Sequence, residues 1–194
     1  YFSQKLLDEI KQNIEQKKQT IILHNRRGYA NVVECETCGY VTYCGNCDVV
    51  MTYHKSGNEM KCHYCGQKAT KPHICPSCHS QNINSRGVGV EQIHEELGKL
   101  FPESTVDRMD IDSMRRKFAY EKLYEKLESG ETDILVGTQM ISKGLDFDTI
   151  ELVAIPKADS LLHVQDFRVE EKAFQLITQV AGRAGRVSGE GKVI

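Results

Sequence analysis

Short apolar runs alternate along this chain with amphipathic stretches, which indicates strands that alternate with helices. The runs typical of buried strands are residues 20–24, 105–109, 133–137 and 150–155. Apolar residues recur at helical spacing in residues 3–18, 90–100 and 165–180, and again between residues 112 and 130. Strands that alternate with helices predict an α/β fold with a parallel sheet covered on both faces.

Local signals predict where several of these helices begin and end. Ser3 is expected to cap the first helix, since a serine oxygen can accept a free N–H of the first turn. Asp112 or Ser113 is expected to cap the helix that follows the second strand run, with Tyr120 facing the core. Gly130 is expected to end that helix, because glycine readily takes the left-handed conformation found there.

The stretch from Cys35 to Cys78 departs from this pattern and contains every cysteine of the chain. The eight cysteines form four pairs with two residues between partners: Cys35/Cys38, Cys44/Cys47, Cys62/Cys65 and Cys75/Cys78. Two thiolates so spaced can bend around one ion at about 2.3 Å per Zn–S bond, and two pairs complete a tetrahedral site. Four pairs therefore predict two zinc ions. Gly39, Gly45 and Gly66 are expected to permit tight turns beside the ligands.

Two alternatives to zinc account for the cysteines less well. Four disulfides would suit a small secreted domain, but the N-terminus shows no targeting segment, and the block lies in a long, Lys- and Glu-rich chain of cytosolic character. A thioredoxin-like redox pair would explain one Cys-x-x-Cys and leave three unexplained.

The spacing of the pairs favours one arrangement of the two zinc sites. The gaps between successive pairs are five, fourteen and nine residues. The fourteen-residue gap is close to the spacing of a zinc ribbon, which places Cys44, Cys47, Cys62 and Cys65 in an inner site. The outer site then holds Cys35, Cys38, Cys75 and Cys78. An interleaved pairing of the first pair with the third stays open beside this nested one.

Composition and length set the domain organisation. The 194 residues, 40% hydrophobic and 27% charged, are enough for one globular domain and a small metal module. We expect residues 1–33 and 81–194 to form one lobe and residues 34–80 an insertion in it. The chain begins at Tyr1 without an initiator Met and ends as a strand begins, which suggests a piece of a longer protein.

Charge and hydropathy narrow the partners and the location. The net charge of −2 gives no overall attraction to nucleic acid, so any phosphate contact must come from local patches. No apolar run approaches the ~20 residues that span a bilayer. The features together predict a cytoplasmic protein without a membrane partner.

Polar loops that follow expected strands are the candidate sites of chemistry. Residues 137–146 and 179–186 are rich in glycine, hydroxyl, amide and cationic groups, which can hold phosphates. The adjacent arginines Arg26 and Arg27 follow the first strand, where α/β proteins often bind ligands. A helix cap with solvated arginines, or a solvated charged turn, stays open as the alternative.

The chain has no P-loop of its own. Gly98-Lys99 and Gly191-Lys192 lack the Ser or Thr that must follow the lysine. The chain by itself is therefore predicted not to hydrolyse ATP. It could instead supply arginine fingers to a nucleotide that is bound by a P-loop elsewhere.

Residues 179–186 resemble motif VI of superfamily 2 helicases, and residues 137–146 resemble their motif V. Together with Asn25-Arg26-Arg27-Gly28-Tyr29-Ala30 and the four cysteine pairs, they make the whole chain resemble the C-terminal RecA-like lobe of the PriA family. Those primosomal replication helicases (protein N′) restart stalled forks in bacteria. The resemblance implies an ATP-dependent 3′→5′ DNA helicase whose P-loop lies in the preceding lobe.

The resemblance also implies roles for individual residues. Arg183 and Arg186 would reach the phosphates of ATP, which binds with Mg²⁺ in the complete protein. The other residues implied near the nucleotide are Gln179, Gly144 and Asp146, and those implied along the DNA strand are Thr138 and Lys143. The eight cysteines match the two zinc sites of the family. Val90, Gln165 and Lys172 depart from the family pattern and receive no role.

The resemblance implies partners as well, and one other class of function competes with it. The partners would be branched and single-stranded DNA, other primosome proteins and single-stranded-DNA-binding protein. The competing hypothesis is a non-enzymatic zinc module that binds nucleic acid or protein, with the α/β part as scaffold. A zinc-free superfamily 2 translocase is excluded by the cysteine block.

Overall fold

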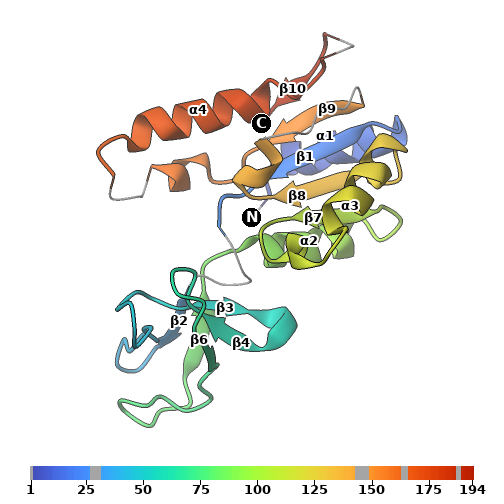
Figure 1. Ribbon diagram of the computed structural model, residues 1–194. Coiled ribbons are helices and arrows are strands. Elements are labelled where there is room, and N and C mark those ends of the chain that lie inside the picture. The colour runs from blue at the N-terminus through green and yellow to red at the C-terminus, as the bar shows by residue number, and fades with distance from the viewer. Residues whose placement is uncertain (1, 27–31, 143–148, 163–165, 187–188) are drawn as a thin grey trace. The chain divides into compact units, whose positions relative to one another are not determined.

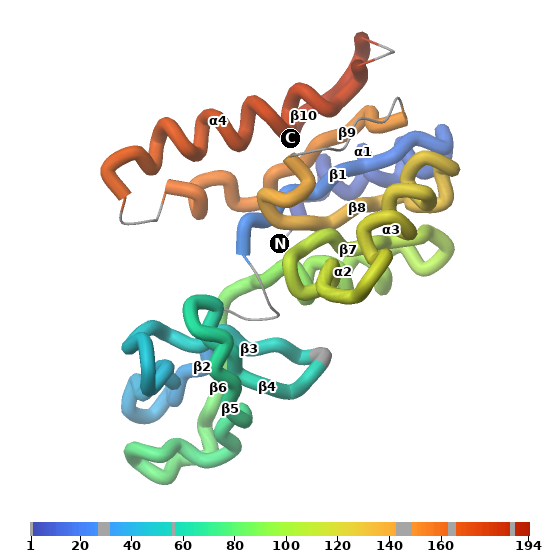
Figure 2. The backbone as a smooth tube through the Cα atoms, in the orientation of Figure 1, coloured from blue at the N-terminus to red at the C-terminus, as the bar shows by residue number. Residues whose placement is uncertain are grey.

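The protein consists of two compact units. The computed structural model describes residues 2–26, 32–142, 149–162, 166–186 and 189–194 (Figure 1). Residues 1–25 with 96–194 form one unit, which we call the α/β unit, and residues 26–95 form the other, the Cys-rich unit. Figure 2 follows the backbone from one unit into the other and back.

A five-stranded parallel sheet forms the centre of the α/β unit. The strands run in the order β10-β9-β1-β8-β7. Their bounds are β1 Gln19–Leu23, β7 Val106–Met109, β8 Ile134–Gly137, β9 Ile150–Ala154 and β10 Lys192–Val193. All five residues of β1 are buried, and Ile21 lies opposite both Leu135 of β8 and Val153 of β9. The predicted parallel α/β sheet is confirmed.

Helices lie against both faces of this sheet. On one face, Ile21 and Leu23 pack with Leu135 and Val153 into a buried cluster. Helices α3 (Ala119–Glu128) and α4 (Val169–Ala181) and the 3-10 helix η3 (Gln139–Ser142) cover this face. Side chains alternate along a strand, so Thr20 and Ile22 of β1 point the other way. There α1 (Gln4–Glu15) lies against β1 and β9, and Asn13 Nδ2 donates to Thr20 Oγ1 at 3.3 Å.

Two of the predicted helix ends are confirmed. Ser3 caps α1, and its hydroxyl accepts the N–H of Leu6 at 3.2 Å. Gly130 follows the last turn of α3 with a φ of 74°. Its N–H bonds the carbonyl of Leu127 and the N–H of Glu131 bonds that of Lys126, which is the paired hydrogen bonding of a Schellman motif.

The predicted start of α3 is wrong. The carboxylate of Asp110 accepts the N–H groups of Asp112 and Ser113 at 2.7 and 2.8 Å. These local bonds hold a turn in place of a helix, so only the 3-10 helix η2 (Ser113–Arg115) forms there and α3 begins at Ala119. The inward face predicted for Tyr120 is also wrong, since Tyr120 is 39% exposed.

The other helices start and end near the predicted residues. Helix α2 runs over Val90–Leu100, as the sequence predicts. Helix α4 begins at Val169, whereas the predicted start at Gln165 lies outside the described residues. None of the helices in the described part of the chain combines the length and the apolar character needed to cross a bilayer.

The Cys-rich unit is built from short antiparallel strands. One ribbon pairs β2 (Val32–Cys35) with β6 (Ile83–Arg86). A three-stranded sheet joins β3 (Thr52–His54), β4 (Glu59–Lys61) and β5 (Lys68–Thr70). A small buried cluster of apolar residues and cysteines fills the unit: Val33, Cys44, Met51, Tyr53, Met60 and Cys62.

We predict that Gly137→Ala destabilises the α/β unit. Gly137 ends β8 where the backbones of neighbouring strands are close. An added Cβ would lie 2.5 Å from the carbonyl oxygen of Met109 and 2.5 Å from Cγ2 of Ile141. Such overpacking should lower the free energy of unfolding by about 1–3 kcal/mol, measured by denaturant titration.

The matched control for this prediction is Gly98→Ala in α2. A Cβ at Gly98 would meet no heavy atom within 4 Å, so alanine should raise stability by up to about 1 kcal/mol through helix propensity. An unfolding midpoint of Gly137→Ala at or above that of the unchanged protein would contradict the close approach.

Candidate functional site

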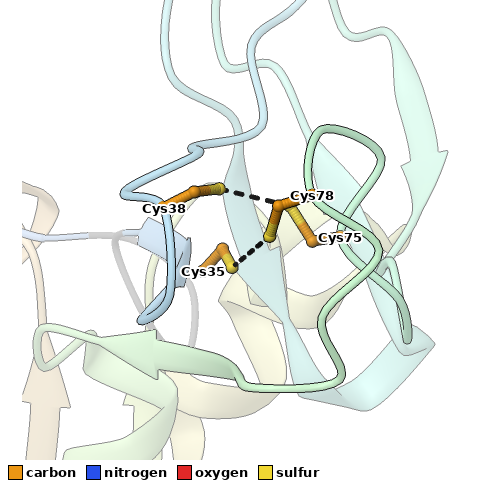
Figure 3. A group of neighbouring side chains, drawn as sticks. All are labelled: Cys35, Cys38, Cys75 and Cys78. Carbon is orange, nitrogen blue, oxygen red and sulfur yellow. Dashed lines mark hydrogen bonds between the residues drawn. The ribbon is translucent and has the colours of Figure 1, made fainter.

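The sulfur atoms of the eight cysteines gather into two groups of four. One group is Cys35, Cys38, Cys75 and Cys78, and the other is Cys44, Cys47, Cys62 and Cys65. Within each group all the sulfurs lie within 4.8 Å of one another. Figure 3 shows the four side chains of the first group converging from two loops. Each group joins the pairs that the nested arrangement joins, and the zinc ions themselves stay a prediction.

The distances between the sulfurs fit a tetrahedral metal ion. The Sγ atoms of Cys35 and Cys78 are 3.6 Å apart, as are those of Cys38 and Cys75. Bonds of about 2.3 Å to a central zinc place neighbouring sulfurs about 3.8 Å apart, whereas a disulfide requires about 2.05 Å. All eight cysteines are free thiols. Both groups therefore fit zinc.

The same turn occurs at all four cysteine pairs. In each, the residue after the second cysteine donates its N–H to the carbonyl of the first cysteine at 2.8–3.0 Å. These residues have positive φ: Gly39 73°, Asp48 52°, Gly66 79° and His79 60°. The predicted role of Gly45 is wrong, because Gly45 lies between two cysteines and has no positive φ. The turn requires this conformation only after the second cysteine.

Backbone N–H groups favour thiolates in both groups. Burial opposes ionisation of Cys35, but N–H groups, that of Cys38 foremost, lower its pKa to about 6. The N–H of Cys65 lowers the pKa of Cys62 to about 7 against the effect of burial. The neighbouring thiol of Cys65 raises the pKa of Cys47 to about 12, as expected where several thiolates crowd together without a cation. Thiolate is the form that binds metal.

A second candidate site lies in the α/β unit at the carboxyl ends of β1 and β8, the edge where parallel sheets bind ligands. A cavity of about 560 Å³ opens there between η3, the segment before α4 and α4 itself. Four amide side chains line it, namely Asn25, Gln139, Gln175 and Gln179. The other residues that line it are Met140, Ser142, Leu161, Asp166, Val169, Lys172, Ala173 and Leu176.

The segment after α4, which we call the arginine turn (residues 182–186), is tied to two neighbouring elements. Nη2 of Arg183 donates to the carbonyl of Ser142 at 3.0 Å, and the N–H of Gly185 donates to the carbonyl of Ile150 at 2.7 Å. Nε of Arg186 donates to the carbonyl of Gly182 at 2.9 Å, and Arg186 is exposed. The structure thus joins the two loops in which the sequence predicts phosphate-binding residues.

The other predicted site residues differ in their exposure, and several lie outside the described part of the chain. Gln179 is exposed and lines the cavity. Thr138 is buried, with 3% of its surface exposed, and its carbonyl accepts the N–H of Ile141. The predicted residues that lie outside the described part of the chain are Lys143, Gly144 and Asp146, together with Arg27, Gly28, Tyr29 and Ala30.

Sequence reasoning missed several residues of the cavity. Lys172 and Gln175 were missed; they project from the same face of α4 as the predicted Gln179, and the spacing of three and four residues between them is the signal that could have found them. Lys172 also forms an ion pair with Asp166. This lysine and the N–H of Arg168 lower the pKa of Asp166, so Asp166 stays ionised at the rim.

Models of two known protein families match parts of this chain. A model of the helicase conserved C-terminal domain matches residues 70–188. A model of the PriA DNA helicase Cys-rich region matches residues 44–69. With the parallel sheet and the two cysteine groups, these matches define a helicase C-terminal domain that carries a Cys-rich insertion. The chain belongs to the family of helicase conserved C-terminal domains, and its Cys-rich part is similar to that of the PriA DNA helicases.

Curated relatives agree over the whole chain. It is 48% identical over 193 residues to the replication restart protein PriA of Bacillus subtilis (strain 168), covering 100% of this chain and 24% of that protein. For PriA of Treponema pallidum (strain Nichols) the identity is 44% over 192 residues, 99% of this chain and 29% of that protein. The chain thus spans about a quarter of the length of these relatives.

The repeated cysteine turn predicts opposite outcomes for two glycine substitutions. A Cβ at Gly66 or at Gly45 would meet no atom within 4 Å, but only Gly66 has positive φ, 79°. Gly66→Ala should therefore destabilise the Cys-rich unit by about 1–2 kcal/mol, the cost of a left-handed non-glycine residue. Gly45→Ala should change its stability by less than about 0.5 kcal/mol. Urea unfolding of the metal-loaded protein measures both, and equal effects would refute the turn assignment.

Proposed function

We propose that this chain is the C-terminal lobe of an ATP-dependent 3′→5′ DNA helicase that restarts stalled replication forks in the bacterial cytoplasm. One observation carries the proposal beyond family membership. The hydrogen bond from Arg183 to the carbonyl of Ser142 links the arginine turn to the end of η3. Lys143 follows Ser142 directly in the sequence. Lys143, Gly144 and Asp146 are residues for which the resemblance to helicases implies contact with nucleotide or DNA.

In this proposal the arginine turn acts on the phosphates of ATP. ATP arrives with Mg²⁺ on the P-loop of the preceding lobe, and this chain supplies the opposite wall. Arg186 is exposed at the turn, and the bond from its Nε to Gly182 fixes the direction of the side chain. A guanidinium so held can stabilise the charge that develops on the phosphoryl oxygens in the transition state. Gln179, one helical turn before Arg183, would face the same nucleotide.

The link between Arg183 and Ser142 would couple hydrolysis to DNA. Arg183 can bond either the phosphates or the Ser142 carbonyl with its several N–H donors. When the phosphate leaves, a shift of Arg183 would be transmitted to η3 and to the following residues Lys143, Gly144 and Asp146. We propose that Gly144 and Asp146 lie near the nucleotide. Thr138 and Lys143 would lie along the phosphates of the DNA strand.

We propose further that each cysteine group holds one structural zinc ion. Among the residues that the structure describes, the apolar cluster of the Cys-rich unit is small, and a single core rarely gives a domain of this size much stability by itself. The zinc-bearing unit would then serve DNA unwinding and contacts with primosome proteins and single-stranded-DNA-binding protein.

Paired cysteine substitutions test the two zinc sites. Unchanged protein should contain two zinc ions per chain by elemental analysis. Cys35→Ser/Cys75→Ser should retain one ion, because both ligands belong to the same group. Cys35→Ser/Cys62→Ser should retain none. In the interleaved pairing Cys35 and Cys62 would share a site, so Cys35→Ser/Cys62→Ser would retain one ion and Cys35→Ser/Cys75→Ser none. One zinc ion or none in the unchanged protein would refute the proposal of two zinc sites.

Replacement of Arg186 tests the catalytic role in the full-length protein. Arg186→Ala should lower kcat of DNA-stimulated ATP hydrolysis by about 10³-fold or more, as for other arginine fingers, with zinc content unchanged. Arg186→Lys should restore little, because an ammonium cannot reproduce the planar fork.

The control is Arg115→Ala, which removes an exposed arginine of η2 that pairs with Asp112 at 3.3 Å. The full-length protein with this substitution should hydrolyse ATP normally. The 194-residue chain alone should not hydrolyse ATP. Near-normal turnover by Arg186→Ala would leave the arginine turn as a helix cap only.

A further inference from the structure

Two backbone segments cross at the arginine turn with no space for a side chain between them. A Cβ at Gly191 would lie 2.3 Å from the carbonyl carbon of Ala184, 2.5 Å from its oxygen and 2.5 Å from the nitrogen of Gly185. In the reverse direction, a Cβ at Gly185 would lie 2.0 Å from the nitrogen of Gly191. Gly191 lies outside the segment that resembles motif VI.

A side chain at position 191 is excluded by close atoms and not by the backbone conformation of Gly191. Its φ lies outside the left-handed region, so alanine could adopt the same backbone conformation. The three heavy atoms nearest to such a Cβ all belong to the backbone, so no side-chain rotation could relieve these contacts. Ordinary van der Waals contact begins at 3.4 Å, so one of the two segments must move by about 1 Å.

The segment of Gly191 is held on its far side by the sheet. Lys192 and Val193 pair with β9, and Ile194 exchanges hydrogen bonds with Val153 and Ile155 at 2.9 and 2.8 Å. On the other side, Ala184 and Gly185 lie between Arg183 and Arg186. A displacement of Ala184 therefore moves the backbone that carries both guanidinium groups.

We propose that Gly191 is a positioning residue for ATP hydrolysis, which holds the arginine turn at its working distance by backbone contact. The inference rests on the proposed function of Arg183 and Arg186. Misplacement of a catalytic group by about 1 Å can cost on the order of 10²-fold in rate. Gly191→Ala should thus lower kcat by about that factor, with a smaller change in KM for ATP.

The test compares four variants of the full-length protein: Gly191→Ala, Arg186→Ala, the double variant and Gly98→Ala. Once Arg186 is gone, Gly191 can act only through Arg183, so the double variant should lose much less turnover than the product of the two single losses. Gly98→Ala, with open space around its Cβ, should keep normal turnover. A loss in the double variant equal to the product of the two single losses, or full turnover in Gly191→Ala, would overturn the proposal.

Hydrogen–deuterium exchange separates this inference from the proposed function. In Gly191→Ala the amide of Gly185 should exchange faster, because its bond to the Ile150 carbonyl is strained, while zinc content stays that of the unchanged protein and the unfolding midpoint falls no further than in Gly137→Ala. Unchanged exchange overturns the positioning role, and so does general unfolding of Gly191→Ala. If instead Arg186→Ala hydrolyses ATP normally, the proposed function fails, whatever the exchange at Gly185 shows.

Discussion

The pairing of β1 with strands on both sides is the constraint on which the α/β unit depends. All five residues of β1 are buried, so its N–H and carbonyl groups must find partners within the protein. Parallel pairing with β8 and β9 supplies them and brings the carboxyl ends of these strands to one edge. Asn25, η3 and the Ile150 carbonyl that anchors the arginine turn all take their positions from this register.

A different constraint governs the Cys-rich unit. Its strands are three or four residues long, too short to build a large apolar core. The four cysteine turns order the chain where an apolar core does not, since each turn directs two sulfurs toward a common point. Backbone N–H groups of these turns favour thiolates at Cys35 and Cys62. Local backbone geometry and electrostatics thus prepare a centre that a cation can complete.

Sequence patterns predicted best what depends on local periodicity or spacing. The strands follow from short apolar runs, the cap at Ser3 from the hydroxyl that accepts an N–H of the first turn, and the stop at Gly130 from the conformational freedom of glycine. The start of α3 escaped prediction because the carboxylate of Asp110 captures the N–H groups that a helix would use. The prediction for Gly45 is wrong because the turn needs positive φ only at the residue after the second cysteine of a pair, and Gly45 lies between the two cysteines.

The sequence by itself determined the fold class, the family and the grouping of cysteines into pairs, because these depend on residue type and spacing along the chain. Only the tertiary structure decided which backbone atoms meet. The bond from Arg183 to Ser142 spans 41 positions, and the crossing of Gly191 over Gly185 depends on how β10 returns to β9. No pattern along the chain encodes such contacts, since they arise when the sheet brings distant segments to the same edge.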